Sequence, residues 1–414
     1  MTVNLQDPLS LDIVVESNRA LSVDSSIDND SNDQKCATWV HEALAQVRIR
    51  VFRGHDDTVT SCQFCDGDTK MLSASHDRSL MLWDLVTGEQ LASFNDAHRG
   101  NISQARVSQD TSRIVSCGWD QKLHTWNTET GQLLWTGSHG GIVTCCNFSA
   151  DGKLIISGSD LENVVRIWDA HSGHLIHKIK GLHTSTVTSC SFSPGGDRII
   201  TTSMDRSTKF WDLISNRNTI TLTGHINIVS DASLTNDERW LATVSWDKNI
   251  HISDVSTGMY RNDGAQVIEK AHEGCISSCQ FSGDGQQLVT GGFDARVCIW
   301  DVTNSTQKLK LQGHVGWVED VCFSADQKWV LSCSKDKTIR LWNIMESHSV
   351  PTLLEKKRAF GMNMYKCEEC GKPFSIASED LHVDIKTCVL CRLQVVKERD
   401  SKCAVVSNPS DRGQ

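Results

Sequence analysis

A histidine recurs seven times along the chain at nearly constant spacing, and this repeat constrains the fold more than any other feature. The steps between successive histidines are 43, 41, 44, 42, 47 and 42 residues. A fixed period of this size indicates similar structural units that bury their apolar faces against one another. The seven anchor histidines are His55, His98, His139, His183, His225, His272 and His314.

Three further positions recur with each anchor histidine. Twenty-eight residues later, or 29 in copy three, the chain holds Trp83, Trp126, Trp168, Trp211, Ser253, Trp300 and Trp342. Six residues before that position lies a turn acid, at Asp77, Asp120, Asp205, Asp247, Asp294 and Asp336, while copy three offers Asp160 or Glu162. Four residues before the turn acid lies a hydroxyl residue, at Ser73, Ser116, Ser157, Thr201, Thr243, Thr290 and Ser332.

The segments between these positions alternate with period two, which predicts strands. Copy one reads VTSCQF, KMLSAS and LMLW, separated by turn residues, so each copy holds three clear strands and a weaker fourth. The middle strand is apolar on both faces and needs a neighbouring sheet on each side. Radially packed sheets meet this demand without leaving a long open edge. The sequence therefore predicts an all-β, seven-bladed β-propeller of four-stranded antiparallel blades.

The pairs Gly54-His55 and Trp83-Asp84, with their counterparts in the other copies, resemble the WD40 repeat family over about three quarters of the chain. The resemblance implies that the histidine, hydroxyl residue, acid and tryptophan of one copy share a buried hydrogen-bond network. It also implies that the segment Arg48–Phe52 closes the ring by pairing with the blade of Ile339–Trp342.

A set of Ser, His and Asp can also indicate a hydrolase. Catalysis needs one exposed, activated nucleophile, whereas this set recurs in seven copies, so we expect a structural network and no enzyme activity. The cysteines show a similar repetition, because the position seven residues after each anchor histidine holds cysteine, alanine or valine. A position that accepts all three is expected to be a small core site.

The residue before each turn acid is expected to point to the rim of one face of the propeller. Large groups at turns on one rim indicate an interaction site, because turns usually hold polar residues or glycine. The alternative is that these rings pack on one another around the channel mouth. We call these residues, with one from a neighbouring loop, the rim surface: His76, Trp119, Met204, Trp246, Phe293, Trp317 and Lys335.

The C-terminal segment carries a second signal. Cys367 and Cys370 are followed after 17 residues by Cys388 and Cys391, which fits the spacing of a four-cysteine zinc site. Four thiolates would hold one structural Zn²⁺, and the alternative is that they are unliganded thiols. The run YKCEECGKPFS resembles the first half of a C2H2 zinc finger, but the second half has CVLC where that family has two histidines.

These signals divide the chain of 414 residues into three parts. Residues 1–47 form an acidic, mainly disordered segment, residues 48–354 the propeller, and residues 355–414 a linker with the small zinc module and a disordered end. A net charge of −10 and a pI near 5.9 argue against nucleic-acid binding. The sequence has no membrane-spanning stretch and no signal peptide, so we expect an intracellular protein, cytoplasmic or nuclear, with reduced thiols.

The leading hypothesis is a non-catalytic scaffold or adaptor that binds protein partners on one face, as a monomeric propeller within a complex. A second hypothesis is a substrate receptor of a ubiquitin ligase, a class that the WD40 family includes. Such receptors often carry an arginine two residues after the WD pair, and this chain has none at Val86, Glu129, His171, Ile214 or Thr303. A third is a nucleic-acid-associated factor that acts through the zinc module.

Overall fold

The computed structural model describes residues 39–40, 47–94, 98–256, 265–345, 362–366 and 373–377. These residues fall into two units, 1–347 and 348–414. In the second unit, β30 (Met362–Lys366) pairs with β31 (Pro373–Ala377) in an antiparallel hairpin. The four cysteines predicted to bind zinc, and nearly all of the predicted disordered segment, lie outside the described residues.

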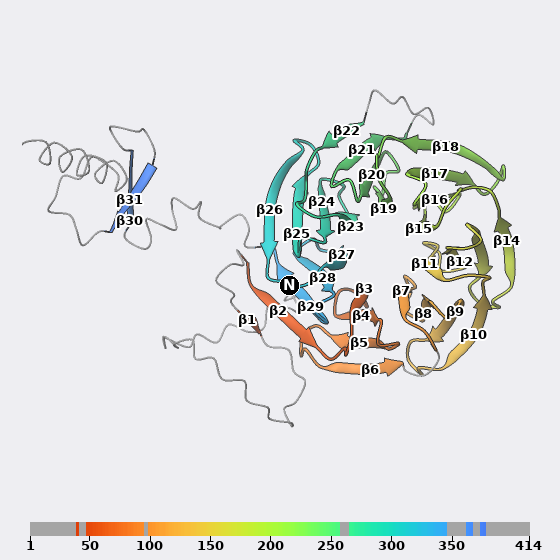
Figure 1. The fold of residues 1–414 in the computed structure, drawn as a ribbon. Helices are drawn as coiled ribbons and strands as arrows, with labels where there is room; N and C mark the ends of the chain where they lie inside the picture. The colour runs from red at the N-terminus through yellow and green to blue at the C-terminus, as the bar shows by residue number, and fades with distance from the viewer. Residues whose placement is uncertain are drawn as a thin grey trace, which may run out of the picture. The chain divides into compact units, whose positions relative to one another are not determined.

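The first unit is a ring of seven antiparallel sheets (Figure 1). Blade one contains β3 (Val59–Cys65), β4 (Lys70–Ser75), β5 (Leu80–Asp84) and β6 (Gln90–Phe94), and blade two contains β7 (Ile102–Val107), β8 (Arg113–Gly118), β9 (Lys122–Asn127) and β10 (Leu133–Ser138). Blade three contains β11 (Val143–Phe148), β12 (Leu154–Ser159), β13 (Val165–Asp169) and β14 (Leu175–Ile179), and blade four contains β15 (Val187–Phe192), β16 (Arg198–Ser203), β17 (Ser207–Asp212) and β18 (Arg217–Thr223). Blade five contains β19 (Val229–Leu234), β20 (Trp240–Ser245), β21 (Ile250–Asp254) and β22 (Gln266–Ile268), and blade six contains β23 (Ile276–Phe281), β24 (Gln287–Gly292), β25 (Arg296–Asp301) and β26 (Thr306–Gln312).

Blade seven joins the two ends of the repeat region. It contains β27 (Val318–Phe323), β28 (Trp329–Ser334), β29 (Thr338–Asn343) and β2 (Ile49–Arg53), with the two-residue β1 (Trp39–Val40) as a fifth strand beside β2. The register of β2 and β29 runs from Ile49 opposite Trp342 to Arg53 opposite Thr338. This pairing confirms the predicted closure of the ring by the segment that precedes the first anchor histidine.

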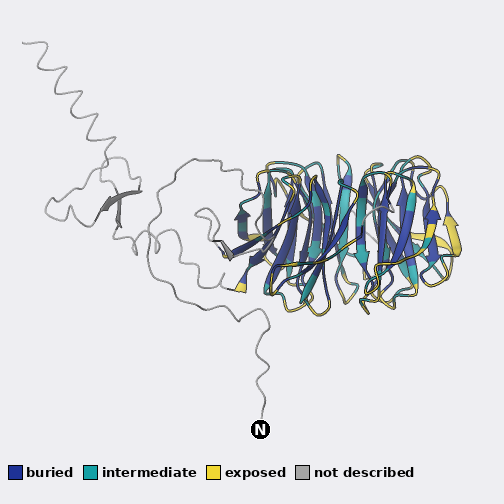
Figure 2. Cartoon of the chain, turned by 90° about the horizontal axis from the view of Figure 1, so that it is seen from below, coloured by how far each residue is buried: buried dark blue, intermediate teal, exposed yellow. Residues whose placement is uncertain are grey.

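Residues become more exposed from the inner strands of each blade to the outermost strand (Figure 2). The second strand of each blade is almost completely buried, as in β4, because a sheet covers each of its faces. The outermost strand is much more exposed, as in β14, where four of five residues are exposed. The first strands of neighbouring blades contact one another around the whole ring, so these strands surround the axis. The predicted seven-bladed, four-stranded architecture is confirmed.

Apolar side chains fill the spaces between neighbouring blades. One core cluster joins blades one and seven and includes Phe52, Trp83 and Leu331. The position seven residues after each anchor histidine belongs to these cores, since Cys62 is 1% and Cys190 is 3% exposed. Burial raises the pKa of both thiols well above its ordinary value, so these cysteines stay protonated and are poor nucleophiles.

Candidate interaction surface at the channel mouth

A hydrogen-bond network fixes the loops of blade one that end at the rim surface. His55 Nδ1 lies 2.8 Å from the carboxylate of Asp77, and His55 Nε2 lies 2.8 Å from Ser73 Oγ. Trp83 Nε1 donates to the same hydroxyl at 2.9 Å. Burial of the Asp77 carboxyl acts to raise its pKa, but hydrogen bonds from His55 and Ser79 outweigh burial and lower it. The network therefore ties together a loop, two strands and a turn that are distant in sequence.

The same network is present in three more blades. His98 contacts Asp120 at 3.0 Å and Ser116 at 2.8 Å, and Trp126 donates to Ser116 at 2.9 Å. The corresponding sets in blades six and seven are His272, Asp294, Thr290 and Trp300, and His314, Asp336, Ser332 and Trp342, with all contacts between 2.8 and 3.0 Å. Ser73, Ser116, Thr290 and Ser332 are all 0% exposed, so no substrate reaches these hydroxyls.

Blade four departs from the expected network at its tryptophan. His183 contacts Asp205 at 2.9 Å and Thr201 at 2.8 Å, as expected. The buried Nε1 of Trp211, however, has no hydrogen-bond partner among the residues that the structure describes. The ring is only partly buried and packs against the apolar cluster between blades three and four. The expectation that Trp211 belongs to the network is therefore wrong, because apolar packing positions its ring instead.

Blade three lacks the acid of the network. His139 Nε2 lies 2.8 Å from Ser157 Oγ, but the buried Nδ1 finds no partner in the described part of the chain. Neither acid offered by the sequence reaches this nitrogen: Glu162 pairs with Arg166 at 2.6 Å, and Asp160 accepts from the amide of Leu161. Burial lowers the pKa of His139 to about 3, so the imidazole is neutral.

Blade five, which lacks the anchor tryptophan, uses a second histidine. His225 contacts Asp247 at 2.9 Å and Thr243 at 3.0 Å, and the ring of His251 stacks on His225 with centroids 3.8 Å apart. Burial lowers the pKa of His251 to about 4, so this ring is also neutral. His251 lies two residues before Ser253, as His124 lies two residues before Trp126 in blade two, where His124 also contacts the anchor histidine His98.

Six residues of the rim surface share one backbone position. The amide that precedes each turn acid donates to a carbonyl in the loop before the first strand of the same blade, for example His76 to Thr58 at 2.9 Å and Lys335 to Trp317 at 2.8 Å. The corresponding backbone amide forms the same hydrogen bond at Trp119, Met204, Trp246 and Phe293. Because the bond recurs at the same end of every blade concerned, these six side chains lie on one face of the ring, as the sequence predicts.

The rim surface is both packed and accessible. Phe293 and Trp317 stack with centroids 4.6 Å apart, Trp246 lies 6.0 Å from Phe293, and Lys335 Nζ lies 4.2 Å from the centre of Trp317. Trp119 remains 52% and Trp317 46% exposed. The rings therefore pack on one another around the channel mouth and still present apolar area to solvent.

A cavity of about 300 Å³ opens beside the rim surface, with His76 and Trp119 in its wall. Its other walls come from the first strands and are polar, with Thr60, Glu319 and Asp320 among them. The polar lining of this channel mouth was not predicted from the sequence. The signal was present, because the residue five positions after each anchor histidine lines it in all seven blades, at Thr60, Ser103, Thr144, Thr188, Ser230, Ser277 and Glu319.

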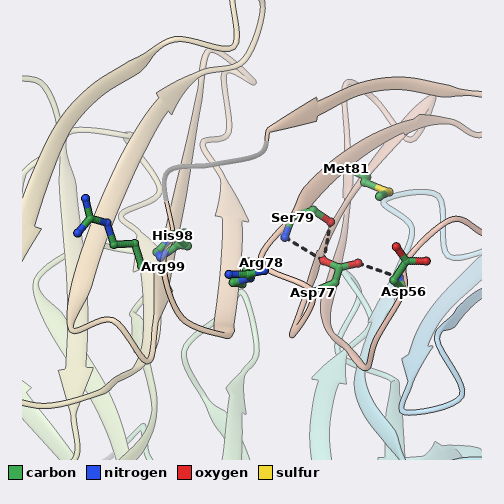
Figure 3. Close-up of a pocket in the computed structure, with 7 residues that line it drawn as sticks. All are labelled: Asp56, Asp77, Arg78, Ser79, Met81, His98 and Arg99. Atoms are coloured by element: carbon green, nitrogen blue, oxygen red, sulfur yellow. Dashed lines mark hydrogen bonds between the residues drawn. The ribbon is translucent and has the colours of Figure 1, made fainter.

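A second cavity of about 470 Å³ lies between blades one and two (Figure 3). Two arginines and two aspartates are among its lining residues, so their charges balance: Arg78, Arg99, Asp56 and Asp77. The carboxylate of Asp77 already accepts from the Ser79 amide at 2.9 Å and the Asp56 amide at 2.9 Å. This groove therefore offers a ligand little uncompensated charge.

One side-chain group in the described residues has the composition of a metal site. His98, Asp120 and His124 have ligand atoms within 4.8 Å of one another. Asp120 is already bonded to His98 Nδ1 at 3.0 Å, as in the other blades, so the structural network accounts for this group. In the described ranges no helix is long and apolar enough to cross a membrane.

Comparison with known proteins extends over the whole ring. The family model "WD domain, G-beta repeat" matches residues 46–84, 88–127, 131–169, 173–212, 216–254, 265–301 and 305–343. The human WD repeat-containing protein 88 is 40% identical over 355 residues, which is 85% of this chain and 75% of the relative. The U5 small nuclear ribonucleoprotein 40 kDa protein of Dictyostelium discoideum is 30% identical over 298 residues, which is 70% of this chain and 83% of the relative. Pre-mRNA-splicing factor cwf17 of Schizosaccharomyces pombe is 26% identical over 293 residues, which is 70% of this chain and 85% of the relative.

Proposed function

Because the chain belongs to the WD40-repeat family, we propose that it is a non-catalytic scaffold that binds protein partners through the rim surface. The observation that carries this proposal is the aromatic cluster of Trp246, Phe293 and Trp317, in which Phe293 stacks on Trp317 and Trp317 remains 46% exposed. Tryptophans in rigid surroundings are frequent binding hot spots, because they bury a large area with little loss of side-chain entropy. A partner would cover this area at small conformational cost.

Several features favour proteins as the partners. The hydroxyl groups of the repeated Ser, His and Asp sets are buried and hydrogen-bonded within the structural network. None of these hydroxyls is therefore exposed for nucleophilic catalysis. The net charge of −10 is unfavourable for binding phosphate backbones. One relative is named as a protein of the U5 small nuclear ribonucleoprotein and another as a pre-mRNA-splicing factor, so ribonucleoprotein complexes are a natural place to search for protein partners of this chain.

Affinity capture with rim variants tests this proposal. We expect Trp119→Ala and Trp317→Ala to lose most captured partners while keeping the melting temperature of the wild type, because both rings are about half exposed. The matched control is Ile214→Ala, which removes an 83% exposed apolar side chain from a turn at the opposite end of the strands. Unchanged capture by both tryptophan variants would refute the rim surface as the binding site.

We also propose that the C-terminal segment contains one structural Zn²⁺ held by Cys367, Cys370, Cys388 and Cys391. The support is the spacing of the two CxxC pairs, since four thiolates complete a closed tetrahedral site. Metal analysis of freshly purified, reduced protein is expected to give one zinc per chain, and Cys370→Ser or Cys388→Ser is expected to release it. Cys298→Ser, which changes a buried propeller thiol, is the control that keeps the metal. Protein without zinc would refute the site.

The proposed location is intracellular. All eleven cysteines in the described residues are free, and ten of them are buried, as expected for a chain kept in a reducing compartment. Mass spectrometry after thiol labelling of the denatured chain is expected to find these cysteines unpaired, and a native disulfide would contradict the proposal.

A further inference from the structure

The residues five positions after the seven anchor histidines surround the channel mouth, and one of them differs in chemistry from the other six. Six of them are serine or threonine, and the seventh is Glu319. In five blades the hydroxyl donates to a backbone carbonyl of the next blade at 2.5 to 3.1 Å: Thr60 to Ile102, Thr144 to Val187, Thr188 to Val229, Ser230 to Ile276 and Ser277 to Val318. These five hydroxyls therefore join neighbouring blades. Ser103 forms no such bond with a described residue, and Glu319 is the one acid among the seven.

The Glu319 carboxyl forms no hydrogen bond or ion pair with any residue that the structure describes, although it is half-buried in the wall of the cavity. The charge of Lys335 acts to lower the pKa of Glu319, but the Lys335 ammonium lies over the Trp317 ring and forms no ion pair with Glu319. Burial raises the pKa of Glu319 to about 7, so the site favours either a proton or a cation on this carboxyl.

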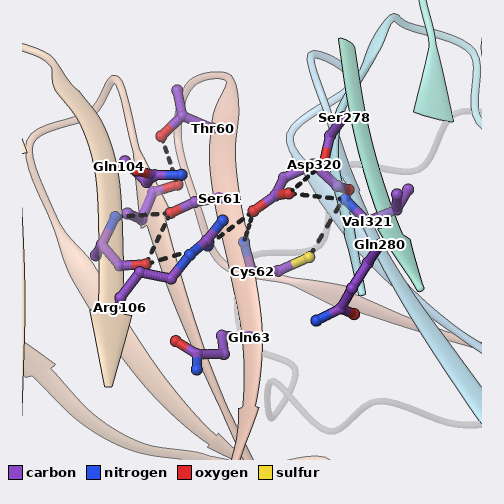
Figure 4. Close-up of polar contacts among 12 residues, drawn as sticks. Thr60, Ser61, Cys62, Gln63, Gln104, Arg106, Ser278, Gln280, Asp320 and Val321 are labelled. Carbon is purple, nitrogen blue, oxygen red and sulfur yellow. Dashed lines mark hydrogen bonds and ion pairs between the residues drawn. The ribbon is translucent and has the colours of Figure 1, made fainter. Parts of the chain in front are cut away.

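The other charged groups of the channel are already compensated. Arg106 Nη1 lies 2.9 Å from Asp320 Oδ2, and this buried pair is neutral as a whole (Figure 4). Ser278 Oγ lies 2.8 Å from Asp320 Oδ1 and 3.1 Å from Asp231 Oδ2. The Asp231 carboxyl also accepts from the backbone amides of Cys279 at 3.1 Å and Ala232 at 2.9 Å, so both of its oxygens already have partners within the ring. Burial raises the pKa of Asp231.

The uncompensated acid of the channel is thus Glu319, and it lies next to the aromatic rim. We propose that the channel mouth accepts one lysine or arginine side chain of a protein partner, with Glu319 as its counter-ion. This inference rests on the proposed function, because the rim surface would bind the residues on either side of that basic side chain. A cavity of about 300 Å³ has room for a long side chain, whose methylene groups would pass the rings of Trp317 and Phe293.

Charge complementarity selects this occupant over an apolar one. A leucine or phenylalanine in the cavity would leave the Glu319 carboxyl buried without a partner, at a cost to affinity. An acidic side chain would add like charge beside Glu319 and Asp320. A basic side chain supplies the missing positive charge and donates hydrogen bonds to the hydroxyl oxygens of Ser103 and its neighbours in the ring.

A peptide-display library selected against the full-length chain tests the inference. Peptides that require Trp317 for binding are expected to share one lysine or arginine at a fixed distance from apolar residues. A synthetic peptide with a selected sequence should bind Glu319→Gln at least about tenfold more weakly than the wild type, which corresponds to about 1.4 kcal/mol. The control is Glu129→Gln, which removes an exposed carboxylate from a turn at the opposite end of the strands.

A second arm separates a direct contact from general electrostatics. Replacing the basic residue of the peptide by norleucine or citrulline should weaken wild-type binding about as much as Glu319→Gln does, and combining the two changes should add little. Additive effects, or Trp317-dependent peptides without a shared basic residue, would overturn the inference and leave the proposed function intact. A library without any binder that requires the rim surface would count against both.

Discussion

Replacement of His272 by alanine is the sharpest test of the structural role of the repeated histidines. The imidazole is 3% exposed and bonds the Asp294 carboxylate at 3.0 Å and the Thr290 hydroxyl at 2.8 Å. Thr290 is fully buried and the Asp294 side chain is 7% exposed, so His272→Ala leaves two shielded polar groups with one hydrogen bond fewer each. At about 1 to 3 kcal/mol for each group, the free energy of unfolding should fall by about 2 to 6 kcal/mol.

Blade three provides an internal comparison for this estimate. His139 is similarly buried but contacts only Ser157, because its Nδ1 has no described partner. His139→Ala therefore leaves one group unsatisfied and should cost about 1 to 3 kcal/mol. Urea unfolding followed by tryptophan fluorescence measures both losses. A loss for His272→Ala no larger than that for His139→Ala would refute the claim that the carboxylate contact stabilises the blade.

Two further predictions concern pH and ring closure. Burial holds the pKa of His139 at about 3 against about 6.5 in the unfolded chain, so unfolding takes up a proton between these values and stability falls as pH decreases through this window. At pH 5 His139 alone should lower the free energy of unfolding by about 2 kcal/mol relative to neutral pH. Urea titrations measure this, and the same pH dependence in His139→Gln as in the wild type would contradict the prediction. Deletion of residues 1–53 removes β2 and should abolish the cooperative melting transition, whereas deletion of residues 1–35 should leave the melting temperature unchanged. A large drop caused by the shorter deletion would show that the ring needs more than β2 to close.

The sequence predicted the architecture well because the repeat supplies the same information seven times. Each copy shows the period-two alternation of its strands, and the position of Arg48–Phe52 ahead of the first anchor histidine predicted closure with β29. The rim surface was also predictable, since one position of a repeated turn lies at the same place in each blade where the turn is kept.

The departures arise where a contact depends on orientation instead of sequence position. Trp211 occupies the expected position, but its indole nitrogen does not bond Thr201. The extra residue in copy three moves Asp160 away from His139, and a spacing alone does not show whether Glu162 compensates. The sequence shows Glu319 as the one acid at a position that otherwise holds serine or threonine. Only the structure shows that Lys335 and Arg106, which contact Trp317 and Asp320, do not pair with it.

Hydrogen–deuterium exchange on a captured complex tests the central claim most directly. If partners bind the rim surface, the loops at 56–58, 76–78, 119–121 and 315–317 should exchange more slowly in the complex than in the free chain. The turns at 86–88, 129–131 and 214–216 lie at the opposite ends of the strands and should exchange at the same rate in both. Protection of those opposite turns, with the rim loops unchanged, would contradict the account.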